Sequence, residues 1–126
     1  MSIVPSDLLY TPDHLWVRVD GAEATIGITD YAQRALGEMD IVELPRVGDA
    51  VAAGREVFVI DCAKAAVGLD APLSGTVVAV NDALTGQPEL VRSGCYGAGW
   101  VFRLRLSDEA ELNSLLAAEA YGRIVS

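Results

Sequence analysis

The chain contains a single lysine, Lys64, and this residue offers the clearest chemistry in the sequence. The other eight basic residues of the 126-residue chain are arginines. Lys64 lies between Ala63 and Ala65-Ala66, and such small neighbours leave its amine accessible to a modifying enzyme. The alternative is an ordinary exposed lysine, but arginine fills that role everywhere else in the chain. We therefore predict that Lys64 is a site of covalent modification.

Cysteine and histidine offer weaker candidates. Cys62 and Cys95 are too few for a disulfide framework, and with His14 they lack the paired short spacing of a zinc site. A catalytic dyad would require His14 beside one of the thiols, and the alternative is a hydrogen-bonded histidine at the start of a strand. The 18 carboxylates are scattered, and nothing marks an acid and base pair. We expect neither a catalytic apparatus nor a metal site.

The charge balance restricts the partners. A net charge of −9 and a pI near 4.3 repel phosphate backbones and anionic membrane surfaces, so we expect no nucleic-acid or membrane partner. A protein with a basic docking surface is the better candidate. No segment approaches the roughly 18 apolar residues of a membrane helix, and the start of the chain does not resemble a signal peptide. The expected location is the cytoplasm.

Most of the chain is predicted to form short strands, and these must position Lys64. A β-rich run ends at Ile60, so we expect the chain to turn at Lys64 and to present the amine at a hairpin tip. Two similar stretches, each leading from a turn of small residues into a β-rich run, favour two facing half-sheets in one domain, residues 1–126. Further strands are expected at 15–19, 23–28, 40–44 and 100–106.

Two helices are predicted. Thr29 or Asp30 suits the N-cap of a short helix near 29–37. Ser107 suits the N-cap of a longer helix over 107–125, where acidic residues follow at once and leucines recur at helical spacing. The sequence thus indicates a mainly β domain with two helical additions.

Six segments, taken in order, resemble the H protein of the glycine cleavage system, a small lipoyl carrier related to lipoyl and biotinyl domains. The segments are YTPDHLWVRV, ATIGITDYAQRALG, VELPRVGDAV, APLSGTVVAVND, PELV and YGAGW. The likeness extends from about Leu9 to Tyr121. It implies a mainly β barrel-sandwich hybrid of two small antiparallel sheets, with a short helix near 29–37 and a C-terminal helix.

Within this resemblance, Lys64 takes the place of the family's lipoyl-lysine. The stretch around it, DCAKA, matches the family's ESVKA segment, so we expect lipoate as an amide on Lys64. Asp61, three residues before the lysine, and Gly75, eleven after it, occupy the places of the family's recognition residues for a lipoate-attaching enzyme. Cys62, His14 and Tyr31 are expected near the attached arm.

The resemblance implies a carrier protein and not an enzyme. A pyridoxal-dependent glycine decarboxylase would load the arm with an aminomethyl group, a folate-dependent aminomethyltransferase would unload it, and dihydrolipoyl dehydrogenase would reoxidise it. Lipoate supplies redox and group-transfer chemistry that no side chain here offers, and the protein supplies tethering and docking.

Four positions depart from the family pattern. Leu15 and Gly68 stand where family members carry carboxylates near the loaded arm, and Cys62 and Cys95 replace a serine and a proline. The cysteines are either small core residues or thiols that exchange with the dithiolane. The second reading favours an H-like lipoate-binding protein that serves a heterodisulfide-reductase-like complex in sulfur oxidation. A third is an unlipoylated H-like protein that acts as a binding or lipoate-relay partner. Glycine cleavage remains the leading interpretation.

Overall fold

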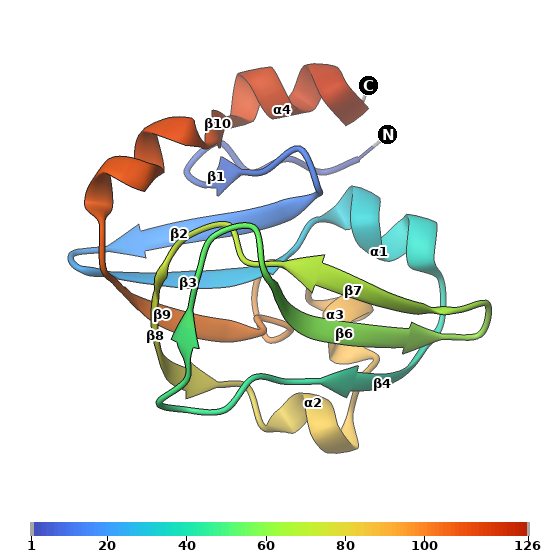
Figure 1. Ribbon diagram of the computed structural model, residues 1–126. Coiled ribbons are helices and arrows are strands. Elements are labelled where there is room, and N and C mark those ends of the chain that lie inside the picture. Colours follow the sequence, from blue (N-terminus) through green and yellow to red (C-terminus); the bar gives the residue numbers. More distant parts are fainter. Residues whose placement is uncertain (1, 126) are drawn as a thin grey trace.

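The computed structural model describes residues 2–125 and contains two antiparallel sheets (Figure 1). The larger sheet has seven strands in the order β10-β1-β2-β3-β9-β8-β5, and the smaller has the order β4-β6-β7. The prediction of two facing antiparallel sheets is confirmed, although the sheets differ in size. The larger sheet comprises β1 (Leu9–Tyr10), β2 (Leu15–Asp20), β3 (Glu23–Ile28), β5 (Ala50–Val51), β8 (Gly75–Val80), β9 (Phe102–Leu106) and β10 (Leu116–Ala117). The smaller comprises β4 (Met39–Glu43), β6 (Glu56–Cys62) and β7 (Ala66–Asp70).

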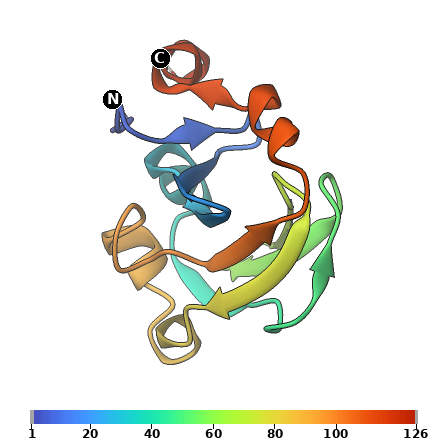
Figure 2. The ribbon, with the colours of Figure 1, turned by 90° about the vertical axis from the view of Figure 1, so that its left-hand side faces the viewer.

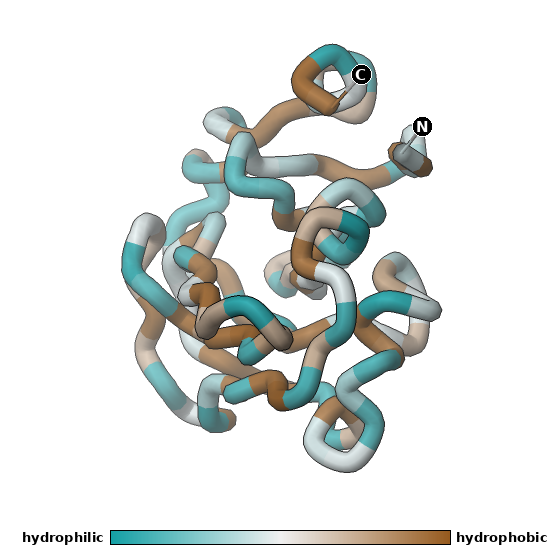
Figure 3. The backbone as a smooth tube through the Cα atoms, turned by 90° about the vertical axis from the view of Figure 1, so that its right-hand side faces the viewer, coloured by the Kyte–Doolittle hydropathy of each residue, from teal (hydrophilic) through white to brown (hydrophobic). Residues whose placement is uncertain are grey.

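The core lies between the two sheets. Phe58 and Ile60 of β6 are buried against residues of the larger sheet, and the Phe58 and Phe102 rings meet edge to face with centroids 5.9 Å apart. Figure 3 shows hydrophobic and hydrophilic residues interspersed along the backbone. Because strand side chains alternate between the faces, burial of Phe58 and Ile60 turns Val59 and Asp61 outward. The smaller sheet therefore has one face in the core and one open face.

The predicted short helix is present as α1 (Asp30–Leu36). Its N-cap is Thr29, whose hydroxyl accepts a hydrogen bond from the Ala32 amide at 3.3 Å. Gln33 donates to the Asp30 carboxylate at 2.7 Å, so Asp30 serves the first turn without capping it. The helix ends at Gly37, which adopts a φ of 73°. The helix leads directly into β4.

The predicted C-terminal helix is present, but its predicted extent over 107–125 is wrong, because only the last part of this segment is α-helical. The segment forms a 3₁₀-helix, η1 (Glu109–Ser114), then β10, then α4 (Ala118–Val125). Asp108 replaces Ser107 as the cap, since its carboxylate accepts from the Ala110 amide. Leu116 pairs with Tyr10 of β1, so the backbone gains a strand partner that helical spacing of leucines could not reveal. Figure 2 shows α4 beyond β10 and β1 at this end of the molecule.

Two short helices, α2 (Ala83–Gly86) and α3 (Leu90–Ser93), lie in the connection between β8 and β9. Each is anchored by one buried apolar residue, Leu84 in α2 and Val91 in α3. Within residues 2–125, no helix combines the length and the apolar character needed to cross a membrane.

Candidate functional site

Lys64 occupies the tip of the β6–β7 hairpin. The Cys62 amide donates to the Ala65 carbonyl at 3.0 Å, and the Ala65 amide donates back to the Cys62 carbonyl at 3.2 Å. These two bonds close a turn with only Ala63 and Lys64 at its centre. The strands on either side continue the ladder, with Asp61 opposite Ala66. Figure 1 shows the turn between β6 and β7 projecting from the body of the protein at the right-hand side of the view. The predicted hairpin is confirmed.

The Lys64 side chain is exposed. The neighbouring residues Ala63, Ala65 and Ala66 are exposed as well, and each contributes only a methyl group. Within residues 2–125, Lys64 makes no hydrogen bond or salt bridge. The amine is therefore free for an enzyme to approach, and binding of the lysine would break no interaction of the fold.

Asp61 and Cys62 lie on opposite faces of β6. Asp61 pairs with Ile41 of β4 and Ala66 of β7 and points to the open face. Cys62 pairs with the buried Met39, and its Sγ donates to the Ala65 carbonyl at 3.2 Å. The half-buried thiol thus supports the turn at its base.

Gly75 lies in a different sheet from the Lys64 hairpin. It is the first residue of β8, where it pairs with Val51 and Leu106 in the larger sheet. A Cβ atom at this position would collide with the carbonyl oxygen of Arg105. Packing between β8 and β9 therefore requires a glycine here, and a direct role in recognition of Lys64 stays a prediction.

His14 and Tyr31 belong to a separate cluster. Their rings lie 4.5 Å apart, and His14 Nδ1 is 2.8 Å from the hydroxyl of Tyr121, which lies 2.7 Å from the Thr29 hydroxyl. His14 has a φ of 72°, and burial lowers its pKa against the opposing effect of Asp13. The cluster joins the start of β2, the cap of α1 and α4. Among residues 2–125, no hydrogen bond or ring contact connects His14 or Tyr31 to the hairpin tip, and their place near an attached arm stays a prediction.

Cys95 is a core residue. It is buried, its carbonyl accepts from the Trp16 indole at 2.7 Å, and burial raises the pKa of its thiol to about 11. At neutral pH the thiol is protonated and a poor nucleophile. These observations favour the reading of Cys95 as a small packed residue.

The two positions that lack carboxylates differ in their surroundings. Leu15 is fully buried in the main core, where its place in β2 is opposite Ile28. Gly68 lies on the open face of β7, and the space that a side chain would enter is filled by the Glu56 carboxylate. A carboxylate is thus present above Gly68, supplied by β6. No local pattern pointed to Glu56, because only the register of the hairpin brings its carboxylate to Gly68.

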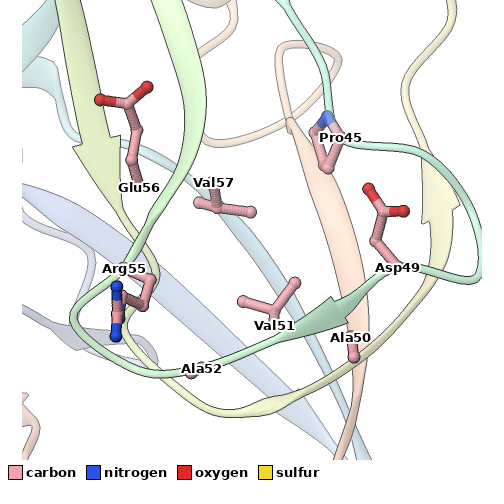
Figure 4. Close-up of a pocket in the computed structure, with 8 residues that line it drawn as sticks. All are labelled: Pro45, Asp49, Ala50, Val51, Ala52, Arg55, Glu56 and Val57. Carbon is pink, nitrogen blue, oxygen red and sulfur yellow. The ribbon is translucent and has the colours of Figure 1, made fainter.

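A shallow hollow of about 520 Å³ lies beside β5 and the start of β6 (Figure 4). Val51, Val57 and Pro45 point into it, while Arg55 and Asp49 lie at its sides. The hollow is at the end of β6 away from Lys64, and none of the predicted site residues lines it.

The two facing sheets and the exposed hairpin lysine define a barrel-sandwich domain of the lipoyl and biotinyl type. The family model for glycine cleavage H-protein matches residues 8–126. The chain is 51% identical to the glycine cleavage system H protein of Shewanella denitrificans, covering 99% of this chain and 98% of the relative, and 52% identical to that of Photorhabdus laumondii, covering 96% and 94%. The crystal structure of a glycine cleavage system H protein from Mycobacterium marinum superimposes with a TM-score of 0.85 at 35% identity, covering 95% of this chain and 97% of that one. The chain belongs to the glycine cleavage H-protein family.

Proposed function

We propose that this chain is the lipoyl carrier of a glycine cleavage system and that Lys64 carries the lipoyl group. The observation that carries the proposal is that the only lysine of the chain lies exposed and unpaired at the tip of a tight hairpin. The family assignment supports a carrier of this kind. Its relatives named above are glycine cleavage system H proteins, which favours this function over sulfur oxidation or an unlipoylated relay.

The residues around Lys64 fit an attached lipoyl group. Bound there, the group supplies a dithiolane that carries an aminomethyl group and reducing equivalents between enzymes. The Cys62–Ala65 turn fixes the base of the arm, and the surrounding alanines leave room for it to swing. An arm of roughly 14 Å reaches into a partner's active site while the body stays outside. The chain then acts as a substrate of its partners and needs no catalytic group.

The enzymes in contact with the arm would be a lipoate-attaching enzyme, a pyridoxal-dependent glycine decarboxylase, a folate-dependent aminomethyltransferase and dihydrolipoyl dehydrogenase. Asp61 is the direct recognition residue for attachment, because it lies next to the turn and points to the open face. Gly75 contributes indirectly, by allowing β8 to pack on β9. We place the carrier in the cytoplasm, which suits two free thiols, Cys62 and Cys95.

Intact-mass spectrometry tests the proposal. Protein purified from its native host is expected to carry one lipoyl group, and peptide mapping is expected to locate it on Lys64. Lys64→Arg keeps the positive charge but removes the acylatable amine, so it should fold normally and remain unmodified. A bare mass for the native protein would contradict the proposal.

A further inference from the structure

A series of hydrogen bonds joins His14 to the first turn of α1 through a tyrosine of α4. His14 Nδ1 lies 2.8 Å from the Tyr121 hydroxyl, and that hydroxyl lies 2.7 Å from the Thr29 hydroxyl. The Thr29 hydroxyl also accepts from the Ala32 amide, which caps α1. Thr29 and Tyr121 are fully buried, so water has no direct access to their hydroxyls. We call the side chains of His14, Tyr121 and Thr29 the His14 network.

The positions of the protons in the His14 network follow from its fixed end. The Thr29 oxygen already accepts from a backbone amide, so its own hydrogen needs an acceptor, and among residues 2–125 only the Tyr121 hydroxyl serves as one. Tyr121 then donates its hydrogen to His14 Nδ1. Every hydrogen in the network thus has an acceptor when the imidazole is neutral and carries its proton on Nε2.

Protonation of His14 would reverse this order. An imidazolium is a donor at both nitrogens, so Nδ1 would donate to Tyr121, and Tyr121 would have to donate to Thr29. The Thr29 hydrogen would then lack an acceptor in a buried site, which is unfavourable. The charged imidazole therefore weakens the network that the neutral imidazole completes.

The other groups that face His14 act in both directions. The Asp13 carboxylate, from the loop before β2, favours the charged imidazole, and so does the face of the Tyr31 ring in α1, whose centroid lies 4.5 Å away. Asp30, also in α1, is already engaged by a hydrogen bond and a salt bridge within that helix. From α4, the Tyr121 ring meets the imidazole edge to face. Burial opposes the charge and is the larger effect, because it lowers the pKa of His14.

We propose that the His14 network is a pH-sensitive latch, which holds α4 and the first turn of α1 to the body of the protein while His14 is neutral and loosens both when His14 is protonated. Tyr121 is the one buried residue of α4, so its contacts determine how firmly that helix is held. In Figure 2, α4 lies at the outside of the molecule, beyond β1 and β10. The latch goes beyond the proposed function, since Lys64 takes no part in it.

The test uses the unmodified full chain, in which His14 is the only histidine and so gives unambiguous NMR signals. Nitrogen-15 spectra at pH 8 should show a proton on Nε2 and none on Nδ1. Between pH 8 and pH 5, as His14 titrates, we expect amide hydrogen exchange in α4 and in the first turn of α1 to become about tenfold less protected, as for the loss of about one buried hydrogen bond. Protection in β3, which is paired on both sides, should stay within about twofold.

Two variants assign the effect to the network. Tyr121→Phe removes the central hydroxyl and keeps the ring that stacks on Tyr10, so α4 should be less protected at pH 8 and should lose its pH dependence. Tyr31→Phe is the matched control, because its hydroxyl makes no hydrogen bond within residues 2–125 and its ring stays against His14. The pH dependence should remain in this control.

Three results would overturn the proposal: a proton on Nδ1 at pH 8, protection of α4 that does not change as His14 titrates, or an unchanged pH dependence in Tyr121→Phe. The first two are measured on the unaltered chain, so they decide the question even where Tyr121→Phe does not fold.

Discussion

Gly75→Ala should reveal how tightly β8 packs on β9. The added methyl group would enter the space of the Arg105 carbonyl oxygen, a backbone atom that cannot rotate away. The strands must therefore separate where Gly75 pairs with Leu106. Overpacking of this kind costs about 1–3 kcal/mol, and a weakened ladder hydrogen bond adds about 1 kcal/mol. Alanine also lowers the conformational entropy of the unfolded chain, and this offsets about 0.5–1 kcal/mol of the loss in stability.

We therefore expect the free energy of unfolding to fall by about 1–3 kcal/mol, which corresponds to a melting temperature lower by roughly 5–15 °C for a chain of this length. Urea titration followed by tryptophan fluorescence measures the change. Gly86→Ala is the control, because Gly86 lies in α2 with no atom within 4 Å of the added carbon; it should leave stability unchanged or raise it by up to about 1 kcal/mol. An unfolding free energy for Gly75→Ala within about 0.5 kcal/mol of the unaltered protein would refute the packing argument.

The same variant separates packing from recognition. At a temperature where Gly75→Ala is fully folded, we expect a lipoate-attaching enzyme to modify Lys64 at a rate within about twofold of normal, because Gly75 lies in the larger sheet, away from the turn. A large loss of rate in the folded variant would show instead that Gly75 takes part in recognition directly.

Three further predictions concern the hairpin and the two smaller sites. Asp61→Asn should slow attachment of lipoate at least tenfold in initial-rate assays while urea unfolding stays within about 0.5 kcal/mol, since the carboxylate is unpaired in the fold; equal rates would remove Asp61 as a recognition residue. The lowered pKa of His14 means that the unfolded chain binds its proton more readily, so stability should decline as the pH falls below about 6.5. His14→Asn, which tolerates the positive φ, should flatten that slope, and an unchanged slope would assign it to another group. In native protein at pH 8, iodoacetamide should alkylate Cys62 and spare Cys95, whereas after denaturation both should react; modification of native Cys95 would contradict its burial and raised pKa.

Local signals in the sequence were sufficient for the Lys64 hairpin and for α1. The β-rich run that ends before Lys64 and the small residues around it predicted the hairpin, and the Thr29 cap predicted α1. The predicted extent of the C-terminal helix was wrong because the spacing of its leucines fits one long helix and a 3₁₀-helix, strand and short helix equally well. Pairing of Leu116 with Tyr10 joins residues more than a hundred positions apart, and no local pattern carries that information.

The residues of the candidate site likewise fall into those that the sequence could single out and those that only the folded structure brings together. Lys64 could be singled out because being the only lysine is a property of the whole composition, and its modification stays a prediction. Glu56 could not, because its position above Gly68 depends on the register of the hairpin. The hydrogen-bonded chain from His14 through Tyr121 to Thr29 was also invisible, since Tyr121 comes from the last helix. Each miss is a contact between distant segments, which only the assembled sheets create.

Modification of Lys64 and the charge of the smaller sheet are physically coupled. Lys64 is the cation at the end of a sheet whose strands carry only carboxylates, and forming an amide on its amine would remove that charge. The net charge would fall by one from −9, and the loss would occur at the point where a partner must approach. Attachment of the arm would thus leave the smaller sheet and its hairpin tip with negative charges alone, so a basic enzyme surface would attract the lipoylated carrier more strongly than the bare chain. We therefore predict that Lys64→Gln, which mimics loss of the charge, competes with a lipoylated H protein for glycine decarboxylase more strongly than Lys64→Arg does at low salt, and equally at high salt. Equal inhibition at low salt would show that the charge at position 64 plays no part in docking.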